Sequence, residues 1–416
     1  MPWRRVDVDE QRMQFVIRAV SGREKMVALC AEFGISRPTG YLWRHRYEQA
    51  RSLTGLREHS RRPHRSPQRT VAWKEERVVA LRQQTGWGAK KLRVLLRDEE
   101  GLALPVRTIH RLLERRGLVA DDVHAPAPTR FERAAPNQLW QMDSKGQYPL
   151  CDGECHPLSI LDDHSRYAVG LYALSALTIE QAHPCLVQTF RRYGVPEAML
   201  MDRGCLWWSA SNDWALTWLS VRLIEQGIRL VYGRVCHPQT QGKVERFHRT
   251  LGAALRHRGV PERIAQWPSA LDEFRHSYNQ RRPHEALGMQ RPAERYRRSP
   301  HAYREQPREW EYPPGSEVRR LNTQGSLVEE HQRWFVCRAL AGQRVRIERF
   351  DGKLLVSYRH MYIREVELAT GRSRPLVVAR RESAESAAEW APPVALGAPC
   401  GAHPAQAGTP ETDRQG

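Results

Sequence analysis

The sequence predicts a multidomain protein with all-α helix-turn-helix units first, then a central α/β domain with a mixed five-stranded sheet, and then a small β-barrel. Three observations predict this order. The 416 residues suffice for two to four domains. Apolar residues recur at helical spacing up to residue 119, and strand-like runs alternate with helical patterns after residue 137. From residue 315, short apolar runs are separated by Gly and charged turns.

The composition also suggests where the boundaries lie. Runs rich in Pro, Arg or Ala separate the segments with a regular apolar pattern. We therefore expect a helix-turn-helix domain (1–56), a basic linker (57–70), a second helix-turn-helix-like domain (71–119), a linker (120–136), the α/β domain (137–300), the β-barrel (315–370) and a disordered tail (380–416).

Charge is concentrated at the front of the chain. The net charge is +19. Residues 1–130 carry 27 Lys and Arg against 15 Asp and Glu, whereas residues 137–290 carry 17 against 15. This asymmetry predicts nucleic-acid binding in the first region and chemistry in the second. A generally Arg-rich composition is the alternative explanation.

The eight cysteines form no even framework, which is typical of a reducing cytoplasm. Cys151, Cys155 and His156 lie close together, and we interpret them as flanking a hairpin turn, with zinc binding as the alternative. No apolar run approaches the roughly 20 residues that span a bilayer. We therefore expect a cytoplasmic protein.

Residues 11–50 have the pattern of a helix-turn-helix. Gly34-Ile35-Ser36 predicts the turn, with Gly34 at positive φ and Ser36 as the N-cap of the next helix. Leu42 and Trp43 are expected to pack inward. The candidate DNA-binding surface of that helix comprises Arg37, Thr39, Tyr41 and Arg44, with His45 and Arg46. A basic helical hairpin without a ligand is the alternative.

A second helical unit follows from Val71 to Leu118. Gly86-Trp87-Gly88 interrupts it, and Leu104-Pro105 opens a last helix that stops at Gly117. Arg107 and Arg111, with Thr108 and Arg115, would form the exposed basic edge of that helix. Two such units in tandem would contact a longer DNA site than one.

Three separated acids carry the predicted chemistry. Asp143 and Asp202 each lie in or just after an apolar strand-like run, and Glu245 lies at the start of an amphipathic helix, off its apolar stripe. Together they could hold two magnesium ions around a phosphodiester, with manganese able to substitute. Asp162 and Asp163 also follow a strand, but the adjoining His164-Ser165-Arg166 reads as a turn, so we assign both a structural role.

Five motifs between about residues 137 and 287 are similar to those of a known protein family. They are Trp140-Gln141-Met142-Asp143, Leu161-Asp162-Asp163-His164-Ser165-Arg166, Met201-Asp202-Arg203-Gly204, the run from His237 to Arg246, and the run from Tyr278 to His284 with Leu287. The segment resembles the integrase catalytic core of retroviral-type integrases and insertion-sequence transposases. The resemblance implies a ribonuclease-H-like fold with an Asp-Asp-Glu metal site at Asp143, Asp202 and Glu245.

Two features depart from that family. Forty-two residues separate Asp202 from Glu245, which is longer than typical and implies an inserted helix. Cys205-Leu206-Trp207-Trp208 replaces the small polar residue and following aromatic that usually come after Gly204.

The resemblance implies a bacterial DNA transposase, nucleoid-associated when bound to DNA. It would bind terminal inverted repeats, cleave the 3′ ends of a mobile element and join them to target DNA. Lys243, Arg246 and the Gln239–Gln241 loop would contact phosphates, and joining two ends implies a homodimer or a larger synaptic assembly. The alternatives are a catalytically inactive DNA-binding regulator derived from a transposase, and a plain nuclease.

Overall fold

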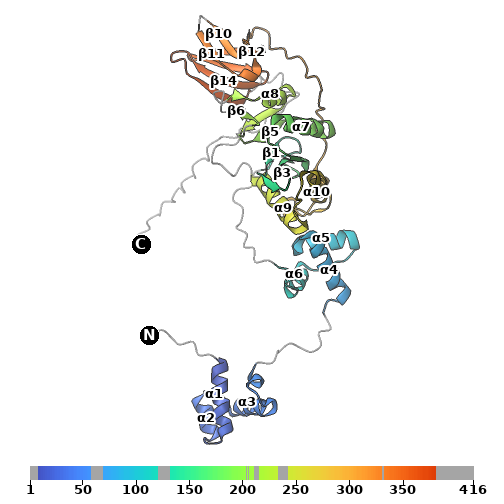
Figure 1. Cartoon of the computed structure of the whole chain (residues 1–416), viewed down its shortest axis with the longest axis vertical. Coiled ribbons are helices and arrows are strands. Elements are labelled where there is room, and N and C mark those ends of the chain that lie inside the picture. The colour runs from blue at the N-terminus through green and yellow to red at the C-terminus, as the bar shows by residue number, and fades with distance from the viewer. Residues whose placement is uncertain are drawn as a thin grey trace, which may run out of the picture. The chain divides into compact units, whose positions relative to one another are not determined.

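The computed structural model describes residues 8–57, 69–119, 132–202, 204, 206–209, 215–232, 242–329 and 332–380 (Figure 1). The chain divides into two compact units, Met1–Val71 and Ala72–Gly416. The expected linkers at 57–70 and 120–136 and the expected tail at 380–416 lie largely outside the described residues.

The first unit is the expected helix-turn-helix. Its helices are α1 (Val8–Ser21), α2 (Met26–Glu32), α3 (Arg37–Ala50) and the 3₁₀ turn η1 (Leu53–Leu56). Gly34 has φ +63°, and the Ser36 hydroxyl accepts a hydrogen bond from the Thr39 N–H at 3.3 Å. Both details of the predicted turn are therefore confirmed.

The inward packing of Leu42 was wrong, because its side chain is 47% exposed. The buried face of α3 is defined by Gly40, where an added Cβ would lie 2.5 Å from Cys30 Sγ. Trp43 packs on the same core. Leu42 lies about 100° around the helix from Trp43, and it therefore points away from this face.

The second unit begins with a helical domain, formed by α4 (Ala72–Thr85), α5 (Ala89–Glu100) and α6 (Val106–Arg115). Leucines of all three helices make its core. Arg107 and Arg111 of α6 are exposed, as expected. This domain contacts the following one through ion pairs from Arg281 to Glu99 at 2.7 Å and from Arg291 to Asp98 at 3.0 Å.

The central domain contains a mixed sheet with strand order β2-β3-β1-β5-β8, and β4 pairs with β3. Its strands are β1 (Trp140–Ser144), β2 (Tyr148–Leu150), β3 (Gly153–Asp162), β4 (Ala168–Leu174), β5 (Ala198–Met201) and β8 (Arg229–Tyr232). Within the described residues this sheet thus has six strands instead of the expected five. β2 was missed because three residues are too few to show alternation. It pairs with β3 in a hairpin whose turn is Cys151-Asp152, so the hairpin interpretation of that cysteine cluster is confirmed.

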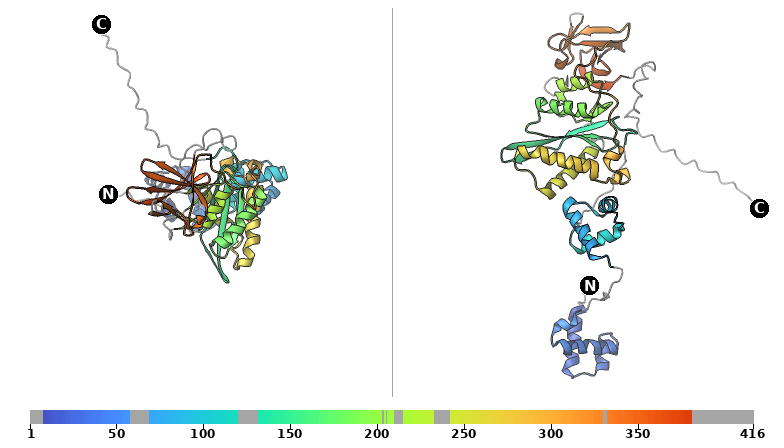
Figure 2. Two further views of the ribbon diagram at one scale, coloured as in Figure 1. Left: turned by 90° about the horizontal axis from the view of Figure 1, so that it is seen from above. Right: turned by 90° about the vertical axis from the view of Figure 1, so that its right-hand side faces the viewer.

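Helices cover both faces of this sheet (Figure 2). One face carries α7 (Ile179–Tyr193) and α8 (Trp218–Glu225), and the other carries α9 (Gly242–Arg258) and α10 (Trp267–His276). Side chains alternate along a strand. Trp140 and Met142 of β1 pack in the α7/α8 core, and Gln141 and Asp143 therefore face α9.

The spacing between Asp202 and Glu245 contains more than an inserted helix. Its described residues include α8 and β8, and also a small antiparallel pair, β6 (Trp208–Ser209) with β7 (Ala215–Leu216). Short elements complete the domain after α9, namely η4 (Ile264–Gln266), η5 (Ser277–Arg281), η6 (Glu285–Leu287) and α11 (Pro292–Arg295).

The described strands of the C-terminal region form a sheet that does not close, so the expected barrel is not shown. Its strands run in the order β15-β14-β13-β12-β9, beside a separate pair of β10 and β11. The elements are β9 (Glu317–Arg320), β10 (Ser326–Glu329), β11 (Gln332–Phe335), η7 (Arg338–Leu340), β12 (Arg344–Phe350), β13 (Lys353–Tyr358), β14 (Met361–Glu367) and β15 (Ser373–Ala379). Among the described strands, none joins the edges β9 and β15.

The physical reason is that this sheet buries its apolar residues against the central domain instead of closing on itself. Its core is continuous with that around α7 and α8. The Tyr358 hydroxyl donates to Glu225 Oε1 at 3.1 Å, and Arg359 donates to the Glu225 carbonyl at 2.9 Å. No helix in the described part of the chain is long and apolar enough to cross a membrane.

Asn279 explains part of the trailing motif. It lies in η5 and is 2% exposed. Its Oδ1 accepts from the Ala168 N–H at 2.8 Å, and its Nδ2 donates to the Ala168 carbonyl at 3.0 Å. One amide side chain therefore satisfies both backbone groups of the first residue of β4, where the β3–β4 register shifts.

Replacing Asn279 with Ala would leave the two backbone groups of Ala168 without their partner. We expect Asn279→Ala to lower the free energy of unfolding by about 2–4 kcal/mol, measured by urea denaturation. The exposed neighbour provides the control, because Gln280→Ala should change stability by less than about 0.5 kcal/mol. Equal effects of the two substitutions would contradict this role for Asn279.

Candidate active site

Three elements of the central domain bring the candidate acids to one edge of its sheet. β1 and β5 are parallel neighbours, with Trp140 opposite Met199 and Gln141 opposite Leu200. Continuing this register by two residues sets Asp143 level with Asp202, which directly follows β5. Neighbouring strands lie about 4.8 Å apart. Glu245 lies in the first turn of α9, which contacts β1 and packs against β3 and β4.

Burial and the two other acids both affect the ionisation of Asp143. Burial and the charges of Asp202 and Glu245, opposed by a hydrogen bond from the Ser144 N–H, together raise the pKa of Asp143 to about 6. That bond is 2.9 Å long. The Asp143 side chain is 20% exposed, whereas Asp202 and Glu245 are open to solvent. A partly buried acid thus lies near two exposed ones.

The donor chemistry of the three acids suits a hard divalent cation. Within the described residues, neither Lys nor Arg forms an ion pair with any of the three. Carboxylate oxygens are the ligands that magnesium prefers. Nevertheless, no three His, Cys, Asp or Glu side chains of the described segments are gathered closely enough to hold a metal ion. Mutual repulsion of like charges opposes such gathering without a cation.

His248 is a residue of this site that the sequence analysis missed. It lies one turn after Glu245 on α9 and is 8% exposed. Its Nδ1 is 3.7 Å from Asp143 Oδ2, and its Nε2 is 3.0 Å from the Ser159 hydroxyl. Burial lowers its pKa to about 4, helped by Lys145, so the ring is neutral at pH 7. Its spacing of three from Glu245 on the helix was the available signal.

Asp162 closes the turn between β3 and β4. Its carboxylate accepts from the Asn137 N–H at 2.7 Å, and from the N–H and hydroxyl of Ser165 at 2.8 and 2.6 Å. Burial raises its pKa, against these hydrogen bonds. The side chain is fully buried. The structural role expected for Asp162 agrees with these contacts.

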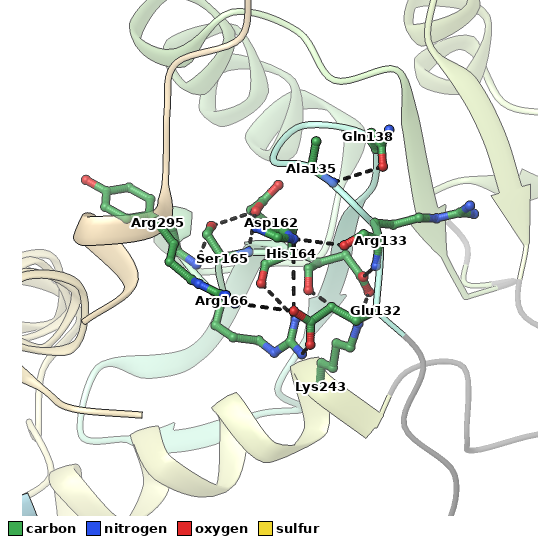
Figure 3. A network of polar contacts seen from close by, with 12 residues as sticks. Glu132, Arg133, Ala135, Gln138, Asp162, His164, Ser165, Arg166, Lys243 and Arg295 are labelled. Atoms are coloured by element: carbon green, nitrogen blue, oxygen red, sulfur yellow. Dashed lines mark hydrogen bonds and ion pairs between the residues drawn. The ribbon is translucent and has the colours of Figure 1, made fainter. Parts of the chain in front are cut away.

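Lys243 points into the protein, although we expected it to face DNA. Its Nζ is 2.6 Å from Asp163 Oδ1, and the side chain is only 17% exposed. Figure 3 shows Lys243 reaching from the start of a helix toward the group of residues around His164 and Arg166. Burial lowers the pKa of Lys243 to about 8, while Asp163 opposes that shift. Its position is explained by the buried acid, which requires a cation.

The other candidate DNA contacts divide by exposure. Arg37, Tyr41, Arg107, Arg111 and Arg246 are exposed. Arg44 is half-exposed and pairs with Glu48 at 2.7 Å. The Thr39 hydroxyl instead lies 2.8 Å from that of Ser36, within the helix cap. The Gln239–Gln241 loop lies outside the described residues.

Comparison with protein families matches the central domain to two models. Both are described as integrase core domains, and they cover residues 133–238 and 226–292. A helix-turn-helix domain model matches residues 11–64, and a homeodomain-like domain model matches residues 39–113. The first pair of matches contains β1, β5 and α9, and the second pair falls on the helical segments.

Two curated relatives agree with these matches. The chain is 26% identical over 243 residues to an uncharacterized 31.7 kDa protein of insertion element IS407 from Burkholderia multivorans, covering 53% of this chain and 81% of that protein. It is also 26% identical over 188 residues to the Gag-Pol polyprotein of feline leukemia virus, covering 44% of this chain and 11% of the polyprotein.

Solved structures give weaker likenesses. The dimeric form of the HTLV-2 integrase catalytic core domain in complex with magnesium is 17% identical, with a TM-score of 0.27, over 35% of this chain and 89% of that one. A simian T-cell lymphotropic virus intasome in complex with PP2A regulatory subunit B56 gamma is 14% identical, with a TM-score of 0.36, over 74% and 99%. Because these TM-scores are below 0.5, the family matches, and not the solved structures, support the fold assignment.

The raised pKa of Asp143 predicts a cost in stability without metal. In the presence of a chelator, Asp143→Asn should raise the free energy of unfolding at pH 7.5 by about 1–3 kcal/mol. The folded pKa of about 6 exceeds the ordinary 3.8, so the native state loses stability as pH rises between these values. The gain should therefore vanish near pH 3.8. Urea denaturation at both pH values tests this, with Asp351→Asn in an exposed turn as control. An equal difference at both values would contradict the prediction.

The family matches and the sequence motifs coincide along the chain. Asp143, Asp202 and Glu245 all fall within residues 133–292, which the integrase core models cover. The helix-turn-helix models precede them. The chain therefore matches integrase core domains over its central part and helix-turn-helix domains before it.

Proposed function

We propose that this protein is a DNA transposase that cleaves the 3′ ends of a mobile element and joins them to target DNA. The observation that carries this proposal is that β1 and β5 run in register and so set Asp202 level with the partly buried Asp143. Burial raises the pKa of Asp143, and the charges of Asp202 and Glu245 raise it as well. A carboxyl group with a raised pKa that lies beside further acids is typical of functional sites. The integrase core matches support the reaction class.

The three carboxylates would hold two magnesium ions, which when bound would activate the attacking oxygen and stabilise the leaving 3′ oxygen. Asp143, the least exposed of the three acids, would hold the ions together with Asp202 and Glu245. His248 would limit the movement of Asp143 from the side of α9, because its ring fills the space between Asp143 and Ser159.

Both chemical steps are displacements at phosphorus. In the first, water forms a bond to phosphorus and the P–O3′ bond breaks, which leaves a 3′-hydroxyl on the element and a 5′-phosphate on the flanking strand. In the second, that 3′-hydroxyl forms a bond to a target phosphorus while the target P–O3′ bond breaks. Neither step requires a covalent bond to the protein or a redox partner.

Recognition of the element ends would fall to the helical domains. α3 presents Arg37, Tyr41 and Arg44, and α6 presents Arg107 and Arg111. Basic and hydrogen-bonding residues on an exposed helix suit the major groove. Arg246 is exposed next to Glu245, where it could bind a phosphate near the cleaved bond. Two ends must be joined together, so we expect a homodimer or a larger assembly.

The proposal predicts loss of chemistry without loss of binding. Asp143→Asn, Asp202→Asn and Glu245→Gln should each lower the strand-transfer rate by about 1,000-fold or more, since several kcal/mol of charge stabilisation is lost. Gel assays with element-end DNA would measure transfer and binding separately. Asp152→Asn, at the β2–β3 turn, is the matched control and should retain both.

Two outcomes would contradict this assignment. Transfer by Asp143→Asn at the normal rate would remove that acid from the site. Tight binding to element ends by the unmodified protein, without transfer under any divalent ion, would favour the inactive regulator.

DNA recognition by α6 gives a separate prediction. If Arg111 contacts a base, Arg111→Ala should weaken binding to element ends by about 1–3 kcal/mol. If Arg111 contacts a phosphate, the slope of the logarithm of the binding constant against the logarithm of the salt concentration should fall by about one. Fluorescence anisotropy at several salt concentrations measures both quantities. Arg97→Ala, an exposed arginine of α5 paired with Asp98, should change neither. Equal losses from both substitutions would argue against α6 as the reading helix.

A further inference from the structure

The carboxylate of Asp163 joins the two elements that carry Asp143 and Glu245. It follows β3 directly and is fully buried. Its Oδ1 accepts from Gln141 Nε2 at 2.7 Å and lies 2.6 Å from Lys243 Nζ. Its Oδ2 accepts from the Arg133 N–H at 2.9 Å. A single side chain thus ties β1 to the first turn of α9.

Both attachment points lie immediately beside candidate metal ligands. Gln141 is two residues before Asp143, and alternate residues of a strand share a face. Lys243 is two residues before Glu245, within the same first turn of α9. A shift of either contact would therefore move the neighbouring carboxylate.

The surroundings hold Asp163 itself in place. The Arg166 guanidinium donates to Glu132 Oε2 at 3.0 Å, and His164 Nδ1 lies 2.8 Å from the Arg133 carbonyl. Figure 3 shows these residues converging with Lys243 and Arg295 around the β3–β4 turn. The polar contacts of this group connect residues 132–133, β1, the turn after β3 and α9, so the group can act as a rigid reference point.

A contribution to stability alone is a weak explanation for a buried charge pair. The cost of desolvating two ions offsets most of their mutual attraction. Apolar side chains of similar volume often give a protein the same stability. Fixing one element relative to another is the better-attested benefit of such a pair.

We propose that Asp163 and Lys243 are positioning residues, and that their ion pair sets the placement of Glu245 relative to Asp143 before metal binds. The inference rests on the proposed function. It assigns to Lys243 an indirect part in the reaction, in place of the phosphate contact that the sequence predicted.

The test uses the full chain and two neutralising variants. Lys243→Met leaves Asp163 buried without its cation, whereas the double variant Asp163→Asn/Lys243→Met removes both charges and should fold normally. The affinity for Mn²⁺ is measured from the electron paramagnetic resonance signal of free Mn²⁺. This assay requires neither DNA nor catalytic activity. In the double variant we expect Mn²⁺ affinity and the strand-transfer rate to fall by about 10- to 100-fold, with unchanged binding to element ends. Lys243→Arg should retain more of both than Lys243→Met.

A second ion pair of the same sheet is the matched control. Arg229 Nη2 lies 3.1 Å from Glu197 Oε2, and the Arg229 side chain is 11% exposed. It begins β8, at the end of the strand opposite to the three acids. Arg229→Met removes a comparably buried charge and should leave Mn²⁺ affinity unchanged.

Three outcomes would overturn the inference. They are normal Mn²⁺ affinity in the double variant, a loss of affinity in Arg229→Met as large as in the double variant, and a loss of DNA binding alone in Lys243→Met. Glu245→Gln separates this inference from the proposed function. If Glu245→Gln loses Mn²⁺ binding and the double variant does not, only the positioning role fails. If Glu245→Gln also binds Mn²⁺ normally, the metal site itself is wrong.

Discussion

Repulsion among three carboxylates is the constraint on which the central domain depends. Burial raises the pKa of Asp143, and the charges of the nearby Asp202 and Glu245 raise it as well. Like charges in one place favour moving apart, so the elements that carry them must be fixed by other contacts. The surrounding domain supplies these contacts from both faces of the sheet, where α7 and α8 cover one side and α9 and α10 cover the other.

The fixing contacts are unusually polar for a protein interior. Asp162 satisfies the turn after β3, Asn279 satisfies both backbone groups of Ala168, and Asp163 links β1 to α9. Buried polar groups that are fully paired favour one arrangement over its alternatives, since a shift would leave them unsatisfied. The apolar core supports the sheet in general, and these few groups decide where its edge residues lie.

The remaining domains are joined to this core in two different ways. The C-terminal sheet shares a continuous apolar core with the α7/α8 face, and it is bonded to Glu225 by Tyr358 and Arg359. The second helical domain is joined mainly by charged pairs, such as Arg281 with Glu99. Exposed ion pairs are weak and sensitive to salt. The first attachment therefore resembles the interior of one domain, and the second resembles an adjustable contact.

The sequence by itself determined the helix-turn-helix, because the Gly34 turn and the Ser36 cap are short-range patterns. It also contained the motifs of the central domain, and the integrase core matches bear these out. The placement of Asp143, Asp202 and Glu245 at strand and helix ends was also predictable, because each lies beside its own apolar run. Only the tertiary structure decided that Lys243 turns inward to Asp163, that His248 stands beside Asp143, and that the C-terminal sheet stays open. Each of these depends on a partner far away in the sequence, and no local pattern records which distant residue a side chain will meet.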